Sequence, residues 1–153
     1  MQQTLEVNTA DFAVASEPMV LESSGIGSCV VVCFYDQTQK RGALCHIMLP
    51  KQPDAGALNP LRFADTALPM VLEKLEAMGS PRANLIAHIV GGAHMFKTLG
   101  AFVNHIGGQN VAAVQQTLAQ QGIPIESMNV GGDKGRSVSF ALDSGIVNIT
   151  SRT

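Results

Sequence analysis

The stretch that most constrains the fold is SSGIGSCVVVCFY, which occupies residues 23–35. Its first seven residues form a polar, glycine-spaced segment, and such a composition is typical of a loop. The six residues that follow are apolar and predict a buried strand. We therefore expect Cys29 at the first position of this strand, where its side chain is held rigidly while the neighbouring glycines let another molecule's backbone approach.

A second apolar run, GALCHIMLP at residues 42–50, carries His46 and follows a polar segment short enough to turn a hairpin. Because side chains alternate along a strand, the hairpin register decides whether Cys29 and His46 share a face. A loop of residues 36–39 places the two side chains directly opposite each other. A loop of residues 37–40 leaves them diagonal neighbours on one face, and a three- or five-residue loop would put them on opposite faces.

A cysteine and a histidine that meet can perform nucleophilic acyl chemistry, since the imidazole takes the proton of the thiol. We expect an imidazolium facing Cys29 to lower the pKa of this thiol below its free value of roughly 8.5. Backbone N–H groups near Gly27 and Ser28 are well placed to form an oxyanion hole. Cys33 and Cys45 lie inside apolar runs and are interpreted as core residues.

Several further motifs follow in a fixed order along the chain. Together with the first segment they are SSGIGSCV at 23–30, GALCHIMLP at 42–50, RFADTA at 62–67, IVGGAHMF at 89–96, IGGQNV at 106–111 and GGDKGRSV at 131–138. Their order and spacing closely resemble the CheD family, the chemoreceptor glutamine deamidases of bacterial chemotaxis. The resemblance runs from about Phe12 to Ile149 and implies a single CheD-like deamidase domain over residues 1–153.

The resemblance implies a Cys–His–Thr catalytic set. The nucleophile of the family falls on Cys29, its base on His46 and its hydroxyl residue on Ser23, where the family pattern has threonine. A serine keeps the hydroxyl that can accept a hydrogen bond from the imidazole and hold its tautomer. The chain also departs from the pattern at Gln109, in place of a common arginine, and at His88, in place of a usual lysine.

The resemblance further implies the substrate, a glutamine on the cytoplasmic helices of methyl-accepting chemotaxis receptors, and a partner, the CheC-type phosphatase. The glutamine would become glutamate with release of ammonia through a cysteine thioester. A methyl ester passes through the same thioester, so a glutamate methylesterase side activity stays open. Two other classes also stay open: a non-catalytic adaptor that binds receptors or the phosphatase, and a redox-sensing thiol protein.

Composition indicates a compact protein of one domain. The formal net charge of the 153 residues is −2, which gives no basic footprint for nucleic acid. No apolar run approaches the ~18–20 residues of a membrane span, and the first residues do not read as a signal peptide. Three cysteines cannot all pair within one chain, which favours a reducing compartment. We therefore expect a cytoplasmic location without direct membrane insertion.

The order of elements predicts a single-domain layered α/β sandwich with mostly antiparallel sheets and two main helices. The first helix is expected to start at the pair Asn59-Pro60 and to kink at Pro69, and the second to run from an Asn110 cap to Gly122. The histidines are not spaced like a zinc motif, and the glycine pairs lack the pattern of a dinucleotide loop, so no metal and no cofactor is implied. Further strands are expected at residues 12–15, 85–90, 123–130, 137–142 and 146–150.

Overall fold

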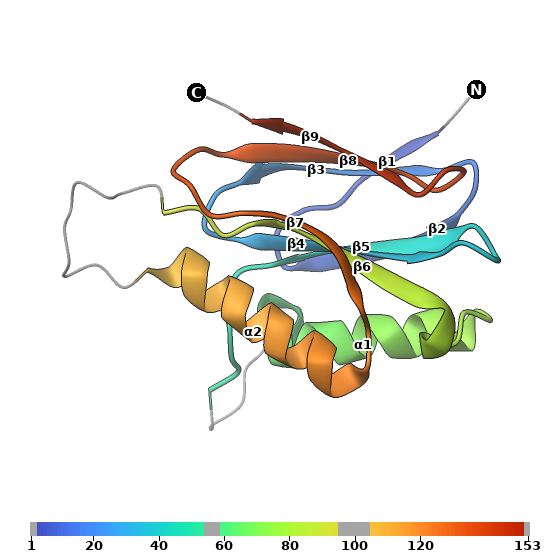
Figure 1. Cartoon of the computed structure of the whole chain (residues 1–153), viewed down its shortest axis with the longest axis horizontal. Helices are drawn as coiled ribbons and strands as arrows, with labels where there is room; N and C mark the ends of the chain where they lie inside the picture. Colours follow the sequence, from blue (N-terminus) through green and yellow to red (C-terminus); the bar gives the residue numbers. More distant parts are fainter. Residues whose placement is uncertain (1–2, 54–58, 95–104, 152–153) are drawn as a thin grey trace.

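The protein is described by a computed structural model that places residues 3–53, 59–94 and 105–151. Within these ranges two sheets and two α-helices stack in three layers, and Figure 1 shows the helices covering one face of the middle sheet while the other sheet covers its opposite face. All strand pairings among the described residues are antiparallel except β1–β3 and β6–β7. The predicted α/β sandwich with mostly antiparallel sheets is confirmed.

The middle sheet has five strands in the order β2-β5-β4-β6-β7. Its strands are β2 (Asp11–Ser16), β5 (Arg41–Ile47), β4 (Val30–Asp36), β6 (Leu85–Gly91) and β7 (Ile125–Val130). Every residue of β4 is buried, because this central strand is covered on both faces. Asp36 pairs with Arg41, so the β4–β5 hairpin loop comprises residues 37–40.

The outer sheet has four strands in the order β1-β3-β8-β9. They are β1 (Thr4–Glu6), β3 (Val20–Ile26), β8 (Arg136–Ala141) and β9 (Ile146–Ser151). The predicted loop over residues 23–29 is therefore wrong for residues 23–26, which belong to β3. Leu21 and Ser23 both point inward, and a bulge after Ser23 turns Ile26 inward as well. Because a polar serine takes an inward position, this segment lacks the alternation of apolar and polar residues that indicates a strand.

The helical layer consists of α1 (Ala64–Ala77) and α2 (Ile106–Gln121), with short 3-10 turns η1 (Pro60–Arg62) and η2 (Arg82–Asn84). The side chain of Asn59 caps η1, and α1 begins only after it. Asn110 lies inside α2, four residues after its start, so the predicted helix cap at this residue is wrong. The helix ends as expected at Gly122, which has a left-handed backbone. Neither described helix is long and apolar enough to cross a membrane.

Two apolar cores lie on the two faces of the middle sheet. One core fills the space between this sheet and the helices and includes Cys45, and the other lies between the two sheets and includes Cys33. Burial raises the pKa of both thiols, for Cys45 to about 12. The interpretation of Cys33 and Cys45 as core residues is confirmed, and their positions on opposite faces of one sheet keep them from pairing with each other.

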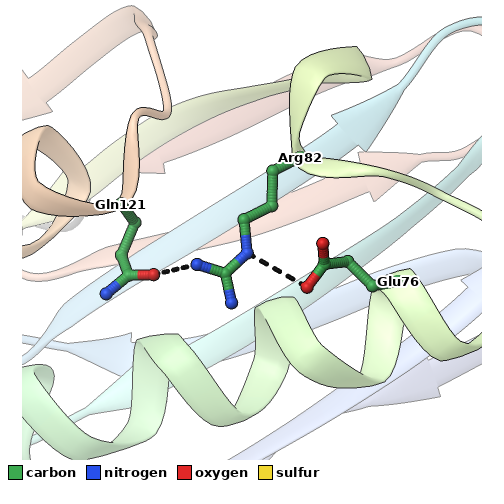
Figure 2. Close-up of polar contacts among 3 residues, drawn as sticks. All are labelled: Glu76, Arg82 and Gln121. Carbon is green, nitrogen blue, oxygen red and sulfur yellow. Dashed lines mark hydrogen bonds and ion pairs between the residues drawn. The ribbon is translucent and has the colours of Figure 1, made fainter.

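A surface contact joins the C-terminal ends of the two helices. Arg82 in η2 donates a hydrogen bond from Nε to Glu76 of α1 over 3.1 Å, and it donates another from Nη1 to the side-chain oxygen of Gln121 in α2, as Figure 2 shows. The side chains of Arg82 and Glu76 are both partly exposed. This contact lies at the hairpin end of the middle sheet, because η2 leads directly into the residue of β6 that pairs with Asp36.

Candidate active site

Cys29 and His46 lie at the open end of the β4–β5 pair, opposite the hairpin. The ladder pairs Val31 with His46 and Val30 with Ile47, and it ends there. Cys29 is thus one residue beyond the last pair and stands diagonal to His46. Of the two registers that place the residues on one face, the structure has the one with the 37–40 loop. Cys29 is partly exposed, whereas His46 is 1% exposed.

The hydroxyl of Ser23 fixes the tautomer of His46. Ser23 Oγ lies 2.7 Å from Nδ1 of the imidazole and 2.8 Å from the carbonyl oxygen of Val7. A carbonyl can only accept, so the single hydroxyl proton goes to Val7, and Oγ must accept a hydrogen bond from Nδ1–H. Nε2 then carries the lone pair, and within the described residues this buried atom has no hydrogen-bond partner. The imidazole therefore presents an unprotonated nitrogen that can act as a base.

Burial sets the charge of the pair. It lowers the pKa of His46 to about 4 and raises the pKa of the Cys29 thiol. A hydrogen bond from the backbone N–H of Cys29 itself offsets only part of the increase in the thiol pKa. Desolvation disfavours both the imidazolium and the thiolate. The expectation of an imidazolium that lowers the thiol pKa is therefore wrong, and both groups are neutral near pH 7. A neutral imidazole with a lone pair on Nε2 can accept the proton of a thiol during attack on a substrate.

The segment that carries Cys29 is held by its carbonyl groups. Three consecutive carbonyl oxygens, those of residues 27, 28 and 29, each accept a hydrogen bond from outside the segment. The donors are Ala93 N to Gly27 O over 2.9 Å, Asn110 Nδ2 to Ser28 O over 2.9 Å, and Gly92 N to Cys29 O over 2.8 Å. Three fixed carbonyls fix three peptide planes, so the backbone around the thiol has a defined orientation.

The end of β6 and the turn after it approach this segment closely because Gly91 and Gly92 have no side chains. A Cβ on Gly91 would lie 2.3 Å from the carbonyl oxygen of Cys29, and the backbone there has φ +119°. On the other side of the turn, a Cβ on Gly107 of α2 would lie 2.4 Å from the carbonyl oxygen of Ala93. Both distances are too short for any residue larger than glycine. These glycines bring the start of α2 against the turn and the turn against Cys29.

Asn110 is a site residue that the sequence interpretation missed. Its side chain is fully buried, and Nδ2 donates to Ser28 O and also to Met48 O, each over 2.9 Å. Met48 follows β5 and would be the next partner of Cys29 if the ladder continued. The available signal was an asparagine two residues after a glycine pair within one motif, and asparagine inside a helix is unfavourable unless its amide has a partner.

The other histidines make contacts of their own in the described structure. His88 contacts the hydroxyl of Ser127 at 2.6 Å, and the ring of His94 lies 4.4 Å from the ring of His105 between centroids. The described parts of the chain contain no group of histidine, cysteine and acidic side chains that could hold a metal ion. Gln109 is an exposed residue of α2. Among the described residues, neither Gln109 nor His88 makes a hydrogen bond to Cys29 or His46.

Comparison with known proteins identifies relatives over most of the chain. Residues 48–151 match the family model described as CheD chemotactic sensory transduction. A protein of Clostridium novyi named "Probable chemoreceptor glutamine deamidase CheD" is 41% identical over 147 residues, which cover 95% of this chain and 91% of the relative. Proteins with the same name from Syntrophomonas wolfei and Methanococcus vannielii are each 39% identical to this chain. Each alignment covers 95% of this chain, and the alignments cover 91% and 93% of the two relatives, respectively.

Proposed function

The chain belongs to the CheD family, and we propose that it is a protein-glutamine deamidase in which Cys29 is the nucleophile, His46 the base and Ser23 the residue that orients His46. The proposed substrate is a glutamine side chain on the cytoplasmic helices of a methyl-accepting chemotaxis receptor, and the proposed domain spans residues 1–153. The observation that carries the proposal is the Ser23–His46 hydrogen bond, because it leaves Nε2 unprotonated at a position diagonal to the thiol.

The first step starts from a neutral pair. Nε2 of His46 takes the proton of Cys29 as the sulfur forms a bond to the carboxamide carbon, and the electron pair of the C=O bond moves to the oxygen. The imidazolium formed in this step still donates a hydrogen bond from Nδ1–H to Ser23 Oγ, and the hydroxyl of Ser23 still donates to the carbonyl oxygen of Val7. Since burial lowers the pKa of this imidazolium to about 4, it readily gives its Nε2 proton to the amide nitrogen. The C–N bond then breaks, the C=O bond re-forms, and ammonia leaves the glutamyl thioester.

The developing oxyanion needs donors beside the thiol. We place them in the peptides of residues 27–29, namely the N–H groups of Ser28 and Cys29, with Gly27 supplying the carbonyl that holds the first peptide. Within the described residues no other residue accepts a hydrogen bond from either N–H. One such donor typically lowers the barrier by about 2.7–4 kcal/mol.

The second step hydrolyses the glutamyl thioester. Water loses a proton to Nε2 of His46 and attacks the thioester carbon. The C–S bond then breaks as Nε2–H gives that proton to the sulfur, so glutamate leaves and the neutral thiol and imidazole are restored. A glutamate methyl ester would give the same thioester with methanol in place of ammonia, so we propose methylesterase activity as a side reaction. A cytoplasmic location and binding to a CheC-type phosphatase complete the proposal and rest on the family resemblance.

The test is conversion of glutamine to glutamate in purified receptor fragments, mapped by mass spectrometry with ammonia release measured in parallel. Conversion by the wild-type protein and by Cys33→Ala, with none by Cys29→Ala, is the expected result. Receptor binding without conversion would support the adaptor alternative instead. The raised pKa of Cys29 disfavours the redox-sensing alternative, because reactive sensor thiols have low pKa values.

A further inference from the structure

We propose that Asn110 is a positioning residue for the oxyanion hole: its carboxamide fixes the Ser28–Cys29 peptide so that the N–H of Cys29 faces the reacting carbonyl oxygen. The inference rests on the proposed acyl chemistry of Cys29 but not on glutamine as the substrate. It begins with the two hydrogen bonds of Asn110 Nδ2, each 2.9 Å long, to the carbonyls of Ser28 and Met48.

The first bond determines where the N–H of Cys29 points. In a trans peptide the carbonyl and the following N–H point in opposite directions. Asn110 draws the Ser28 carbonyl toward α2, so the N–H of Cys29 is directed away from α2.

The second bond ties the same amide to the strand that carries His46. Ser28 immediately precedes the nucleophile, and Met48 lies two residues beyond His46, at the point where β4 and β5 cease to pair. One carboxamide thus spans the opening of the ladder. Hydrogen bonds from the backbone hold the carbonyls of Gly27 and Cys29. Among the described residues Asn110 is the side chain that donates to this segment.

The unused oxygen of Asn110 indicates that the orientation of the amide matters. Oδ1 is buried and has no hydrogen-bond partner among the described residues. A rotated amide would turn this oxygen toward two carbonyl oxygens, so the donors must face Ser28 and Met48. A buried acceptor without a partner is unfavourable. The unpartnered Oδ1 of Asn110 is explained if the two bonds from Nδ2 are needed to position the Ser28–Cys29 peptide for the reaction.

The test compares two reactions of the same thiol in Asn110→Ala. Acylation by p-nitrophenyl acetate passes through an oxyanion and needs no receptor. Alkylation by iodoacetamide displaces iodide from a saturated carbon and forms no oxyanion, so it reports only the access and ionisation of Cys29. We expect acylation to fall about 100- to 1,000-fold, as for loss of one oxyanion donor, while alkylation at the same pH changes by less than about threefold.

Thr117→Ala is the matched control, because Thr117 is a buried polar residue of the same helix two turns further on and has no recorded bond to residues 27–29. This variant should keep both rates. If Asn110→Ala does not fold, Asn110→Ser gives the same comparison with a shorter side chain that still carries a hydroxyl. Unchanged acylation in a folded Asn110 variant, or equal losses of acylation and alkylation, would overturn the proposal. A wild-type protein that is acylated but converts no receptor glutamine would overturn the substrate assignment alone.

Discussion

The two ends of the β4–β5 pair are built from different kinds of contact. At the hairpin end, Asp36 Oδ1 accepts hydrogen bonds from the backbone N–H groups of Thr38 and Gln39, only two and three residues away. At the open end, Ser23 bonds to His46 across 23 residues, and Asn110 bonds to Ser28 across 82 residues. The hairpin end therefore forms from its own segment, whereas the open end exists only when β3, β5 and α2 have come together.

This difference separates stability from chemistry. Contacts at the open end position the thiol and the imidazole, so their loss should lower activity more than it lowers the free energy of unfolding. Contacts at the hairpin end close a turn far from Cys29, so their loss should lower stability and leave activity unchanged. The predictions below test that separation, from the largest expected effect to the smallest.

Cys29→Ala should abolish deamidation, with a loss of about 10⁴-fold or more, because removal of the nucleophile removes the covalent route. The fold should be retained, since Cys29 is partly exposed and lies outside the ladder. Cys33→Ala is the matched control: it should keep full activity and lose about 1 kcal/mol of unfolding free energy, because it removes one buried atom from the core. Ammonia release and chemical denaturation of both variants measure the two effects. Normal turnover in Cys29→Ala would refute its assignment as the nucleophile.

Ser23→Ala should lower deamidation by about 10- to 100-fold, because the imidazole loses the acceptor that holds Nδ1–H and with it the preferred tautomer. Ser23→Thr should keep most of the activity, since it retains the hydroxyl. A hollow of about 310 Å³ is lined partly by Ser23, Ser24 and Val138. Equal kcat values in all three proteins would reduce the catalytic set to Cys29 and His46.

The low pKa of His46 should move the acid limit of activity. Because the base form is required and burial lowers its pKa to about 4, kcat/KM at pH 5 should remain within about twofold of its value at pH 7. If the pKa of this histidine were the usual value of about 6.5, kcat/KM would fall about 25-fold over the same interval. A pH–rate profile measured on a receptor fragment decides between the two, and an acid limb near pH 6.5 would contradict the burial of a neutral imidazole.

The same group makes stability depend on pH. Above about pH 6.5 the imidazole is neutral in both the folded and the unfolded chain, and its contribution is fully present. As the pH falls from there to about 4, His46 becomes protonated in the unfolded chain while it stays largely neutral in the folded chain. The free energy of unfolding should therefore fall by about 3 kcal/mol over this interval. Denaturation curves of wild type and His46→Gln between these pH values measure the difference. An equal slope in both proteins would assign the acid loss to other groups.

The same contrast explains what the sequence could predict. The 37–40 hairpin was one of two expected registers, and β6 and the end of α2 at Gly122 were also expected, because local periodicity and turn residues define them. Strand β3 was missed because a serine takes an inward position beside a bulge. Asn110 was interpreted as a cap because the carbonyls it binds lie 62 and 82 residues away, and one sequence carries no signal of such distances.

At the hairpin end, Asp36→Ala should lower the free energy of unfolding by about 1–2 kcal/mol, because two turn N–H groups lose their acceptor. Thr38 and Gln39 are exposed, so their N–H groups can donate to water in the variant, and this limits the loss of unfolding free energy. Deamidation at pH 7 should stay within about twofold of wild type, since substitutions away from reacting groups act mainly through stability. A large loss of kcat in a folded Asp36→Ala protein would show that the two ends are coupled and would contradict the separation argued above.

The smallest effect should come from Arg82→Ala, which removes the contact between the C-terminal ends of α1 and α2 in Figure 2. Its side chain and that of Glu76 are both partly exposed, and exposed ion pairs contribute little because water screens the charges. We expect a change in unfolding free energy within about 0.5 kcal/mol and unchanged turnover. Added salt should weaken the contact further in wild type and leave the variant unaffected. A loss of activity here would mean that the far end of α2 controls the placement of Asn110, because α2 is the element that connects the two positions.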